Sequence, residues 1–488
     1  MLYKSTRGES PIVPFSDVLL GGLAPDGGLY MPESFPKFSI DEINSWSNLE
    51  FHELASKILF PFVEGEIEKD VFNRLVKESY EVFDIDEVVA LKKLDENRWV
   101  LELFHGPTLA FKDLAMQLLG SLLNHFAKER GEKIVVLGAT SGDTGAAAIS
   151  ACSRHQNVEV YILYPHGKVT EFQRKQMTTT QSDNVFPLAI ESDFDGCQDI
   201  VKQMFLDNDL RNQKVKFIAA NSINWTRCMT QSVYFFWTYL KLAQSGEELS
   251  FSIPSGNFGH AYAGWTAKEM GLPIKSLLIA TNKNDVLHKA FSNNNYEKSK
   301  VTQTLAPSMD ISVASNFERL LYNLFDNDSS RLAEKMRSFP ENSILIPENK
   351  QKLVAEFFKS HKCDDEEILQ QIRDTYNEIG YMLDPHTATG VRASNKISSK
   401  EHPVVVMGTA HPIKFSDAIE RAVPDYISEI PERIEGDLKQ KENIKILPED
   451  YSQIKDFIFF LFAFIPFTQY FAKFFVLSAN KSIDCKTL

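Results

Sequence analysis

Cysteine is scarce in this chain, and its spacing is not that of a disulfide or metal framework. The 488 residues include five cysteines, with no CxxC pair among them. These are Cys152, Cys197, Cys228, Cys363 and Cys485. Isolated cysteines predict neither a disulfide scaffold nor a zinc site, and they fit a reducing compartment. We therefore expect no bound metal.

An excess of positive charge and a leading apolar segment are also missing. The net charge of −14 argues against a nucleic-acid surface, because phosphate backbones are bound by basic faces. The first residues, MLYKSTRGESP, lack the apolar core of a secretory signal. We expect a cytoplasmic protein that acts on a small molecule, which can be anionic if the pocket is locally positive. The length predicts two to four domains of roughly 150 residues.

The familiar nucleotide-binding motifs are absent as well. A glycine-rich turn at 140–145 (TSGDTG) is not followed by the lysine that a Walker motif needs. Neither that turn nor a second one at 255–259 (SGNFG) matches G-x-G-x-x-G with an acidic residue on the next strand. These absences exclude a P-loop and a classical dinucleotide fingerprint.

The end of the chain, 457–488, is unusually rich in phenylalanine. Residues 457–477 are long enough to span a bilayer, for which about 20 apolar residues suffice. Pro466, Thr468, Gln469 and Lys473 interrupt the run, and polar groups are costly in lipid. A buried or interface helix, a membrane-surface anchor, a true span and an aberrant translated end all stay open. Membrane insertion is the less favoured interpretation.

Strand–turn–helix units dominate the middle of the chain. Apolar residues recurring every four positions predict a helix over 113–130 that Gly131 ends. We expect strands at 99–104, 133–139, 158–164, 186–190, 217–220, 249–254, 274–281 and 404–407. We expect further helices at 48–64, 67–83, 192–205, 316–337, 347–361 and 365–380, and a long aromatic helix ending near 243. This rhythm predicts an α/β fold with a parallel sheet between helices.

One lysine has apolar neighbours on both sides. Lys112 follows Leu109, Ala110 and Phe111 in the segment FHGPTLAFKD (104–113). Desolvation there would lower the pKa of Lys112 and make the neutral amine a nucleophile suited to a Schiff base with an aldehyde. A lysine at a helix start with its head in water is the other interpretation, and the segment alone favours it.

The two glycine-rich turns each lie between a strand and a helix, where helix N-termini bind anions. The turn at 255–259 offers amide groups without bulky side chains between them, which suits a phosphate dianion. Asp143 makes the turn at 140–145 a poorer phosphate site, but Ser141 and Thr144 would suit a carboxylate. Both turns could instead be ordinary β–α connections.

Together these features favour pyridoxal phosphate as cofactor, because it needs a lysine for its aldehyde and a site for its phosphate. Thr409, at the end of the last predicted strand, could offer a hydroxyl to the pyridine nitrogen. We expect all these groups at the strand ends of one parallel sheet, where ligands collect.

The chain resembles the threonine synthases, which are pyridoxal-phosphate enzymes of fold type II (tryptophan synthase β-like). The resemblance covers residues 5–412 and does not include the end from 457. The matching segments, in the family's order, are STRG, GLAPDGGLYMPE, FHGPTLAFKD, GATSGDTGAAA, SDFDGCQ, NSINWTR, PSGNFG, DPHTATG and GTAHP. The resemblance implies parallel sheets flanked by helices, with an N-terminal accessory α/β domain.

The resemblance also implies domain limits and residue roles. Residues 1–85 would form the N-terminal domain, 86–456 the catalytic region with a smaller α/β subdomain around 113–250, and 457–488 an atypical tail. Lys112 would hold the cofactor as a Schiff base and then move protons. The cofactor would also contact Phe111, Gly256, Asn257, Phe258, Gly259 and Thr409. The substrate would contact Thr140, Ser141, Gly142, Asp143, Thr144, Asn221, Ser222 and Asn224.

The reaction implied by the resemblance converts O-phospho-L-homoserine and water into L-threonine and phosphate. Its leaving phosphate needs cations, for which we nominate Arg227 and Lys175, with Arg7 as a third; each could equally be a solvated surface charge. A phospholyase that releases 2-oxobutyrate and phosphate, and a fold homologue without turnover, are the alternatives. The protein is expected to be a monomer or a homodimer.

Overall fold

A small antiparallel sheet and four helices form the N-terminal part of the chain. The structure, a computed structural model, describes residues 1–140, 142–207, 215–397 and 402–464, the last six by their backbone alone. The small sheet has the order β2-β1-β3, built from Leu2–Ser5 (β1), Val13–Pro14 (β2) and Tyr30–Pro32 (β3). The helices of this domain are α1 (Phe15–Gly21), α2 (Ile40–Asn44), α3 (Phe51–Val63) and α4 (Lys69–Tyr80).

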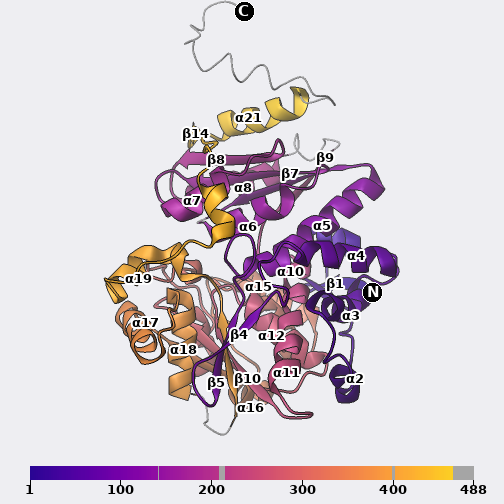
Figure 1. Ribbon diagram of the computed structural model, residues 1–488. Coiled ribbons are helices and arrows are strands. Elements are labelled where there is room, and N and C mark those ends of the chain that lie inside the picture. Colours follow the sequence, from indigo (N-terminus) through magenta and orange to yellow (C-terminus); the bar gives the residue numbers. More distant parts are fainter. Residues whose placement is uncertain (141, 208–214, 398–401, 465–488) are drawn as a thin grey trace, which may run out of the picture.

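A six-stranded sheet forms the larger lobe, in the lower half of Figure 1. Its order is β12-β11-β10-β13-β5-β4, and only the edge strand β4 is antiparallel to its neighbour. The strands are β4 (Ala90–Lys93), β5 (Arg98–Glu102), β10 (Leu249–Pro254), β11 (Ile274–Thr281), β12 (Phe358–Lys362) and β13 (Val404–Gly408). β10 and β13 are fully buried, as expected of parallel strands covered on both faces.

A second, five-stranded parallel sheet forms the smaller lobe, in the upper half of Figure 1. Its order is β14-β8-β7-β6-β9, built from β6 (Lys133–Ala139), β7 (Val158–Pro165), β8 (Val185–Glu191), β9 (Val215–Ala219) and β14 (Lys445–Pro448). The single sheet expected from the strand pattern is therefore wrong, whereas the parallel sheets implied by the family resemblance are confirmed. β9 and β10 belong to different sheets, because the helices α10 (Trp225–Gln231) and α11 (Val233–Leu242) intervene and β10 pairs with β11 and β13 instead.

The remaining helices cover the faces of these sheets. In the smaller lobe and its borders they are α5 (Lys112–Arg130), α6 (Asp143–Cys152), α7 (Glu171–Thr178), α8 (Phe194–Leu206), α20 (Glu432–Leu438) and α21 (Tyr451–Phe464). In the larger lobe they are α12 (Gly259–Glu269), α13 (Val286–Asn293), η1 (Pro307–Met309), α14 (Phe317–Leu324), α15 (Ser329–Ser338), α16 (Glu348–Phe357), α17 (Asp365–Ile379), α18 (Pro385–Ile397), η2 (Pro412–Phe415) and α19 (Ser416–Ala422).

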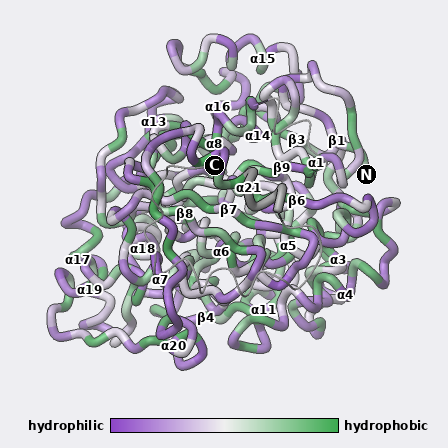
Figure 2. The backbone as a smooth tube through the Cα atoms, turned by 90° about the horizontal axis from the view of Figure 1, so that it is seen from above, coloured by the Kyte–Doolittle hydropathy of each residue, from purple (hydrophilic) through white to green (hydrophobic). Residues whose placement is uncertain are grey.

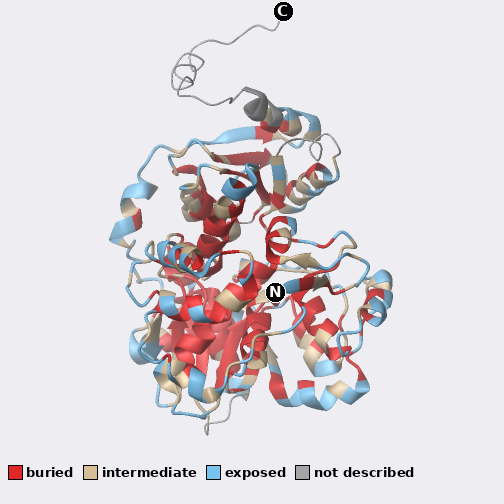
Figure 3. Cartoon of the chain, turned by 90° about the vertical axis from the view of Figure 1, so that its right-hand side faces the viewer, coloured by how far each residue is buried: buried red, intermediate tan, exposed pale blue. Residues whose placement is uncertain are grey.

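Several predicted elements are confirmed at their limits. β6, β10 and β11 have the predicted bounds, α5 ends before Gly131 in the left-handed conformation (φ 63°), and Asp193 caps α8 by accepting a hydrogen bond from the Gly196 amide. Figure 3 shows buried residues concentrated along both sheets and the helices between them, while Figure 2 shows hydrophilic segments around the rim.

Other predicted helices are wrong in part. The helix expected over 316–337 is two helices, because Asp326 and Asn327 take positive φ values between α14 and α15. The helix expected to reach 361 ends at Phe357, since residues 358–362 pair with β11 as an edge strand. The long aromatic helix is interrupted at Ser232, between α10 and α11.

The phenylalanine-rich end begins within α21. Ile454 and Ile458 are buried against the smaller lobe, and Phe457 packs beside them at helical spacing. In the part of the chain that the structure describes, no helix is both long and apolar enough to cross a bilayer. Residues 465–488 lie outside the described residues.

Candidate active site

Lys112 is the first residue of α5, directly after the loop that follows β5. That loop is held to the segment after β13, because the Phe111 amide donates to the Thr409 carbonyl (2.9 Å) and the His411 amide donates to the Leu109 carbonyl (3.0 Å). Leu109 takes a positive φ of 57° to make the turn. The sequence therefore brings Lys112 and Thr409 together from two neighbouring parallel strands.

The Lys112 side chain is enclosed, with 13% of its surface exposed. Burial lowers the pKa of Lys112, and the positive charges of Arg227 and Lys414 lower it further, while Asp143 opposes them. The Asp143 Oδ2 atom lies 3.5 Å from Lys112 Nζ. The expected desolvated lysine is thus present in the structure, and its neutral amine is favoured relative to an exposed lysine.

Asp143 lies at the centre of a group of polar side chains. Lys414 Nζ lies 3.3 Å from its Oδ1 atom, Gln173 donates to Oδ1 at 2.9 Å, and Ser308 Oγ donates to Oδ2 at 3.2 Å. Although burial opposes ionisation, Lys414 and Lys112 hold the pKa of Asp143 well below its usual range. The carboxylate is charged, and it joins the turn after β6 to the lysine after β5. The carboxyl ends of the two sheets therefore meet here.

The turn at 255–259 has the geometry of an anion site. Phe258 takes a positive φ of 65° just before α12, while its ring is buried against Phe291 and Phe317. Within the described residues, the amide groups of Gly256, Asn257 and Phe258 donate no hydrogen bond. Free amides at a helix N-terminus attract a phosphate. A Cβ atom on Gly256 would lie 3.1 Å from Met309 Cα, so the neighbouring loop leaves little room for a side chain.

The turn at 140–145 differs, because its amides are partly used within the turn. Thr140 Oγ1 accepts hydrogen bonds from the Gly142 and Gly145 amides, each at 3.0 Å. Gly142 has a φ of 141° and faces Gln173 so closely that a Cβ atom would lie 2.4 Å from it. Ser141 lies outside the described residues, and Thr144 lies on the first turn of α6.

Two of the nominated residues are among the buried side chains that have no hydrogen-bond partner in the described part of the chain. One is the Thr409 hydroxyl and the other is the Nε and Nη1 pair of Arg227. Burial lowers the pKa of Arg227 to about 10, and its charge contributes to the lowered pKa of Lys112. An unpaired buried donor or acceptor is costly, so both groups are poised for a ligand.

The other nominated residues have protein partners. Asn224 caps α10, and its amide also donates to the Leu19 carbonyl at 2.9 Å. Asn221 accepts from the Ile223 amide at 3.3 Å, and the Ser222 carbonyl accepts from Asn316 at 3.2 Å.

The two remaining cation candidates form ion pairs. Lys175 Nζ lies 2.8 Å from Glu171, one turn away on α7. Arg7 makes a two-pronged contact with Glu318, at 3.1 and 3.0 Å.

Several residues of the site were not nominated from the sequence. Lys414 is fully buried and follows GTAHP by two residues, so its position near that motif was a usable signal. Gln173 and Ser308 carry no motif of their own. His260 stacks on Phe111 at a ring distance of 5.0 Å, and burial lowers its pKa to about 3, so it is neutral.

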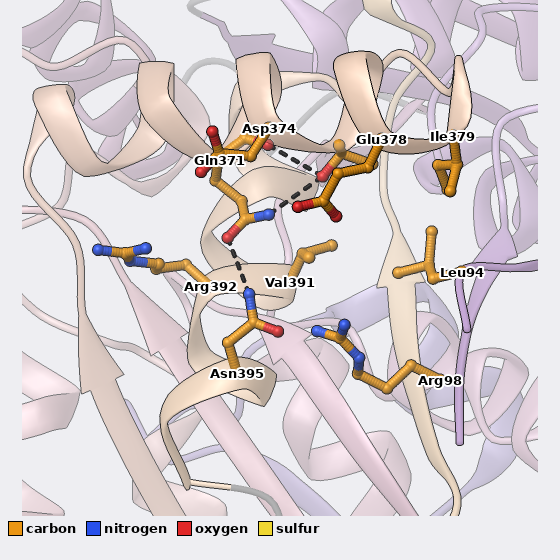
Figure 4. A pocket seen from close by; sticks show the side chains of 10 residues that line it. Leu94, Arg98, Gln371, Asp374, Glu378, Ile379, Val391, Arg392 and Asn395 are labelled. Carbon is orange, nitrogen blue, oxygen red and sulfur yellow. Dashed lines mark hydrogen bonds between the residues drawn. The ribbon is translucent and has the colours of Figure 1, made fainter. Parts of the chain in front are cut away.

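A cavity of about 280 Å³ lies elsewhere, between α17, α18 and the start of β5. Figure 4 shows Asp374 and Glu378 on α17, with Arg392 and Arg98 lying apart from each other and Val391 and Asn395 between them. Because Arg98 begins β5 and Lys112 follows its end, this cavity is at the opposite end of the strand from the candidate active site.

Models of three known families match the chain in succession. "Threonine synthase N terminus" matches residues 2–80, "Pyridoxal-phosphate dependent enzyme" matches 86–409, and "Threonine synthase, C-terminal" matches 387–458. A threonine synthase of Pseudomonas aeruginosa is 46% identical over 460 residues, which cover 94% of this chain and 98% of that protein. The chain belongs to the threonine synthase family.

Other relatives agree with this assignment. The crystal structure of a pyridoxal-phosphate-bound threonine synthase from Brucella melitensis superposes with a TM-score of 0.91 at 41% identity, covering 94% of this chain and 99% of that one. "Threonine synthase-like 2" of Xenopus laevis is 35% identical, covering 91% of this chain and 94% of that protein. The expected fold type II architecture, family and pyridoxal phosphate cofactor are confirmed.

The residues present fit the family's cofactor. The free amides at 256–258 suit a phosphate, the unpaired Thr409 hydroxyl suits a ring nitrogen, and Lys112 suits an aldehyde. A neutral hydroxyl at Thr409, rather than the charged Asp or Arg that can partner the ring nitrogen of pyridoxal phosphate, would moderate electron withdrawal by the ring.

Proposed function

We propose that this protein converts O-phospho-L-homoserine and water into L-threonine and phosphate. The observation that carries the proposal is Lys112, buried beside Asp143 and close to an unpaired, buried Arg227, in a chain of the threonine synthase family. A reactive amine and a cation for a leaving phosphate are what this reaction needs.

Lys112 is proposed to move protons at the substrate's Cα and then Cβ. When bound, pyridoxal phosphate supplies an electron sink for charge that develops at Cα. The lowered pKa of Lys112 lets its amine accept a proton, and Asp143 stabilises the ammonium that results. Lys414 and Gln173 hold the Asp143 carboxylate in place for this purpose.

Arg227 is proposed to bind the departing phosphate. Its Nε and Nη1 groups are buried and free of protein partners among the described residues, whereas Lys175 and Arg7 already form ion pairs. The N-terminus of α6, at the turn 140–145, is proposed to receive the substrate carboxylate. The cofactor phosphate is assigned to Gly256, Asn257, Phe258 and Gly259.

The finer assignments of place and assembly are also proposals. We propose a cytoplasmic enzyme that is a monomer or a homodimer, with domains at 1–85 and 86–456 followed by the segment 457–488. The isolated cysteines and the ordinary composition support the cytoplasmic location.

A phospholyase that forms 2-oxobutyrate and phosphate is the second candidate. Elimination of phosphate from this substrate needs the same reactive amine and the same cation as threonine formation, so Lys112 and Arg227 would serve either reaction. The experiment is product analysis of the purified enzyme with O-phospho-L-homoserine. We expect threonine and phosphate in equal amounts, and 2-oxobutyrate as the main product would overturn the proposal.

The matched control is Lys112→Ala. We expect a loss of threonine formation of about a thousandfold or more, because general acid–base catalysis contributes on that scale. Borohydride reduction of the holoenzyme should place the cofactor adduct on the peptide that contains Lys112. An adduct on another lysine would contradict the assignment.

A further inference from the structure

The segment DPHTATG (384–390) belongs to no part of the proposed reaction, yet it lies next to the candidate active site. Asp384 precedes α18, and its side chain is fully buried. Its carboxylate accepts four hydrogen bonds: from the His386 amide (2.9 Å), from His386 Nδ1 (2.9 Å), from the Thr387 amide (3.2 Å) and from the Thr387 hydroxyl. A helix cap needs only the backbone bonds, so the two side-chain bonds call for another explanation.

The first side-chain bond leads to Lys112. His386 Nε2 accepts a hydrogen bond from the Ser308 amide at 3.1 Å, and an amide can only donate. The proton of the neutral ring is therefore on Nδ1, which donates to Asp384. Ser308 in turn donates its hydroxyl to Asp143 Oδ2 at 3.2 Å, and that carboxylate contacts Lys112.

The second side-chain bond leads to Thr409. The Thr387 hydroxyl donates to Asp384, and its oxygen accepts from the Thr409 amide at 3.1 Å. Because the Thr409 carbonyl also receives the Phe111 amide, this bond fixes the strand end that carries the unpaired Thr409 hydroxyl. One carboxylate is thus connected to both sides of the proposed cofactor site.

We propose that Asp384 is a positioning residue, which acts through His386 and Ser308 on the Lys112–Asp143 pair and through Thr387 on Thr409. The proposal rests on the proposed function. Asp384 contacts neither Lys112 nor Thr409 itself. It sets the His386 tautomer and the Thr387 rotamer, and so it holds the carboxylate partner of Lys112 and the partner of the ring nitrogen in register.

The test variant is Asp384→Asn. Asparagine is also a good helix cap, but it replaces one acceptor oxygen by a donor that faces either His386 Nδ1 or the Thr387 hydroxyl. We expect kcat to fall about tenfold, on the scale of a lost supporting hydrogen bond, with a smaller change in KM. We also expect the pH midpoint of the bound cofactor's absorption, without substrate, to move to lower pH, because Asp143 would stabilise protonated Lys112 less well.

The matched control is Asp26→Asn. The Asp26 carboxylate, in the N-terminal domain, also accepts four hydrogen bonds, from Ser5, Glu9, Ser10 and Gly28. This variant should lose thermal stability, but less than Asp384→Asn because Asp26 is partly exposed, while its kcat and its absorption midpoint stay those of the unchanged enzyme. Should Asp384→Asn fail to fold, His386→Gln replaces it, since glutamine keeps an acceptor for Ser308 and loses the donor to Asp384.

The outcomes separate this inference from the proposed function. The unchanged enzyme is assayed first, and absence of threonine there overturns the proposed function. If the unchanged enzyme forms threonine, an Asp384→Asn or His386→Gln variant with unaltered kcat and midpoint reduces Asp384 to a helix cap and overturns the inference. Equal effects of Asp384→Asn and Asp26→Asn on kcat and midpoint would overturn it too.

Discussion

The two glycine-rich turns, at 140–145 and 255–259, have the same position between a strand and a helix but different chemistry. Each follows a buried parallel strand and opens a helix. In the turn at 255–259, three successive amides are free within the described residues. In the turn at 140–145, Thr140 accepts two amides and Asp143 places a carboxylate between two lysines. The turn at 255–259 offers its free amides to a phosphate dianion, whereas the turn at 140–145 already carries the carboxylate of Asp143.

The largest effect is expected from Asp143→Asn, which removes the negative charge of the turn at 140–145. Lys414 has no exposed side-chain surface, so the variant leaves a buried charge without its carboxylate. We expect the free energy of unfolding at neutral pH to fall by about 3 kcal/mol or more, measured by urea denaturation. Because the native pKa of Asp143 is depressed, its contribution is present above about pH 4, the unfolded value, and is lost as the pH falls. The variant should lack that acid dependence.

The control for this prediction is the double variant Asp143→Asn with Lys414→Met. It removes both charges, so it should recover part of the lost stability. A single variant as stable as the unchanged protein would show that Asp143 and Lys414 are not a coupled pair.

The comparison also predicts where the substrate phosphate binds. The turn at 255–259 is assigned to the cofactor phosphate, and the turn at 140–145 contains the Asp143 carboxylate. Arg227 is therefore the group assigned to the departing phosphate of the substrate. We expect Arg227→Gln to lower kcat/KM for threonine formation about a hundredfold, since a charged hydrogen bond in a buried site contributes roughly 2–3 kcal/mol. Lys175→Gln is the paired control and should change kcat/KM little; the reverse pattern would reassign the phosphate site.

The space available in the turn at 255–259 can be reduced with Gly256→Ala. The added Cβ atom would meet the Met309 backbone at 3.1 Å, and a backbone cannot move aside as a side chain can. We expect cofactor affinity, measured by equilibrium dialysis, to fall about tenfold, roughly 1.4 kcal/mol. Gly436→Ala, where nothing lies within 4 Å of the added atom, should leave the affinity unchanged. Equal affinity in both variants would mean that this turn does not hold the cofactor.

Local patterns predicted the elements that carry the site. The strand–turn–helix order located Lys112, Thr409 and the turn at 255–259, because each depends on a few neighbouring residues. The strand pattern alone did not separate the two sheets, since strand pairing is decided over long distances, whereas the family resemblance implied more than one sheet. Nor did the sequence reveal that Ser308 and Lys414 converge on Asp143 from separate loops. The capping of the first turn by Thr140 depends on a rotamer that no spacing encodes.

The smaller lobe is completed late in the chain. Its edge strand β14 pairs with β8, and α21 packs onto the same core through Ile454 and Ile458. A growing polypeptide that has reached residue 440 has therefore made four of the five strands of this sheet, and β8 still presents an open edge. During synthesis the edge of β8 stays unpaired until residues 445–458 have been translated. The time at which the fold of the smaller lobe is completed is therefore set by translation of β14 and the start of α21, rather than of β6 to β9.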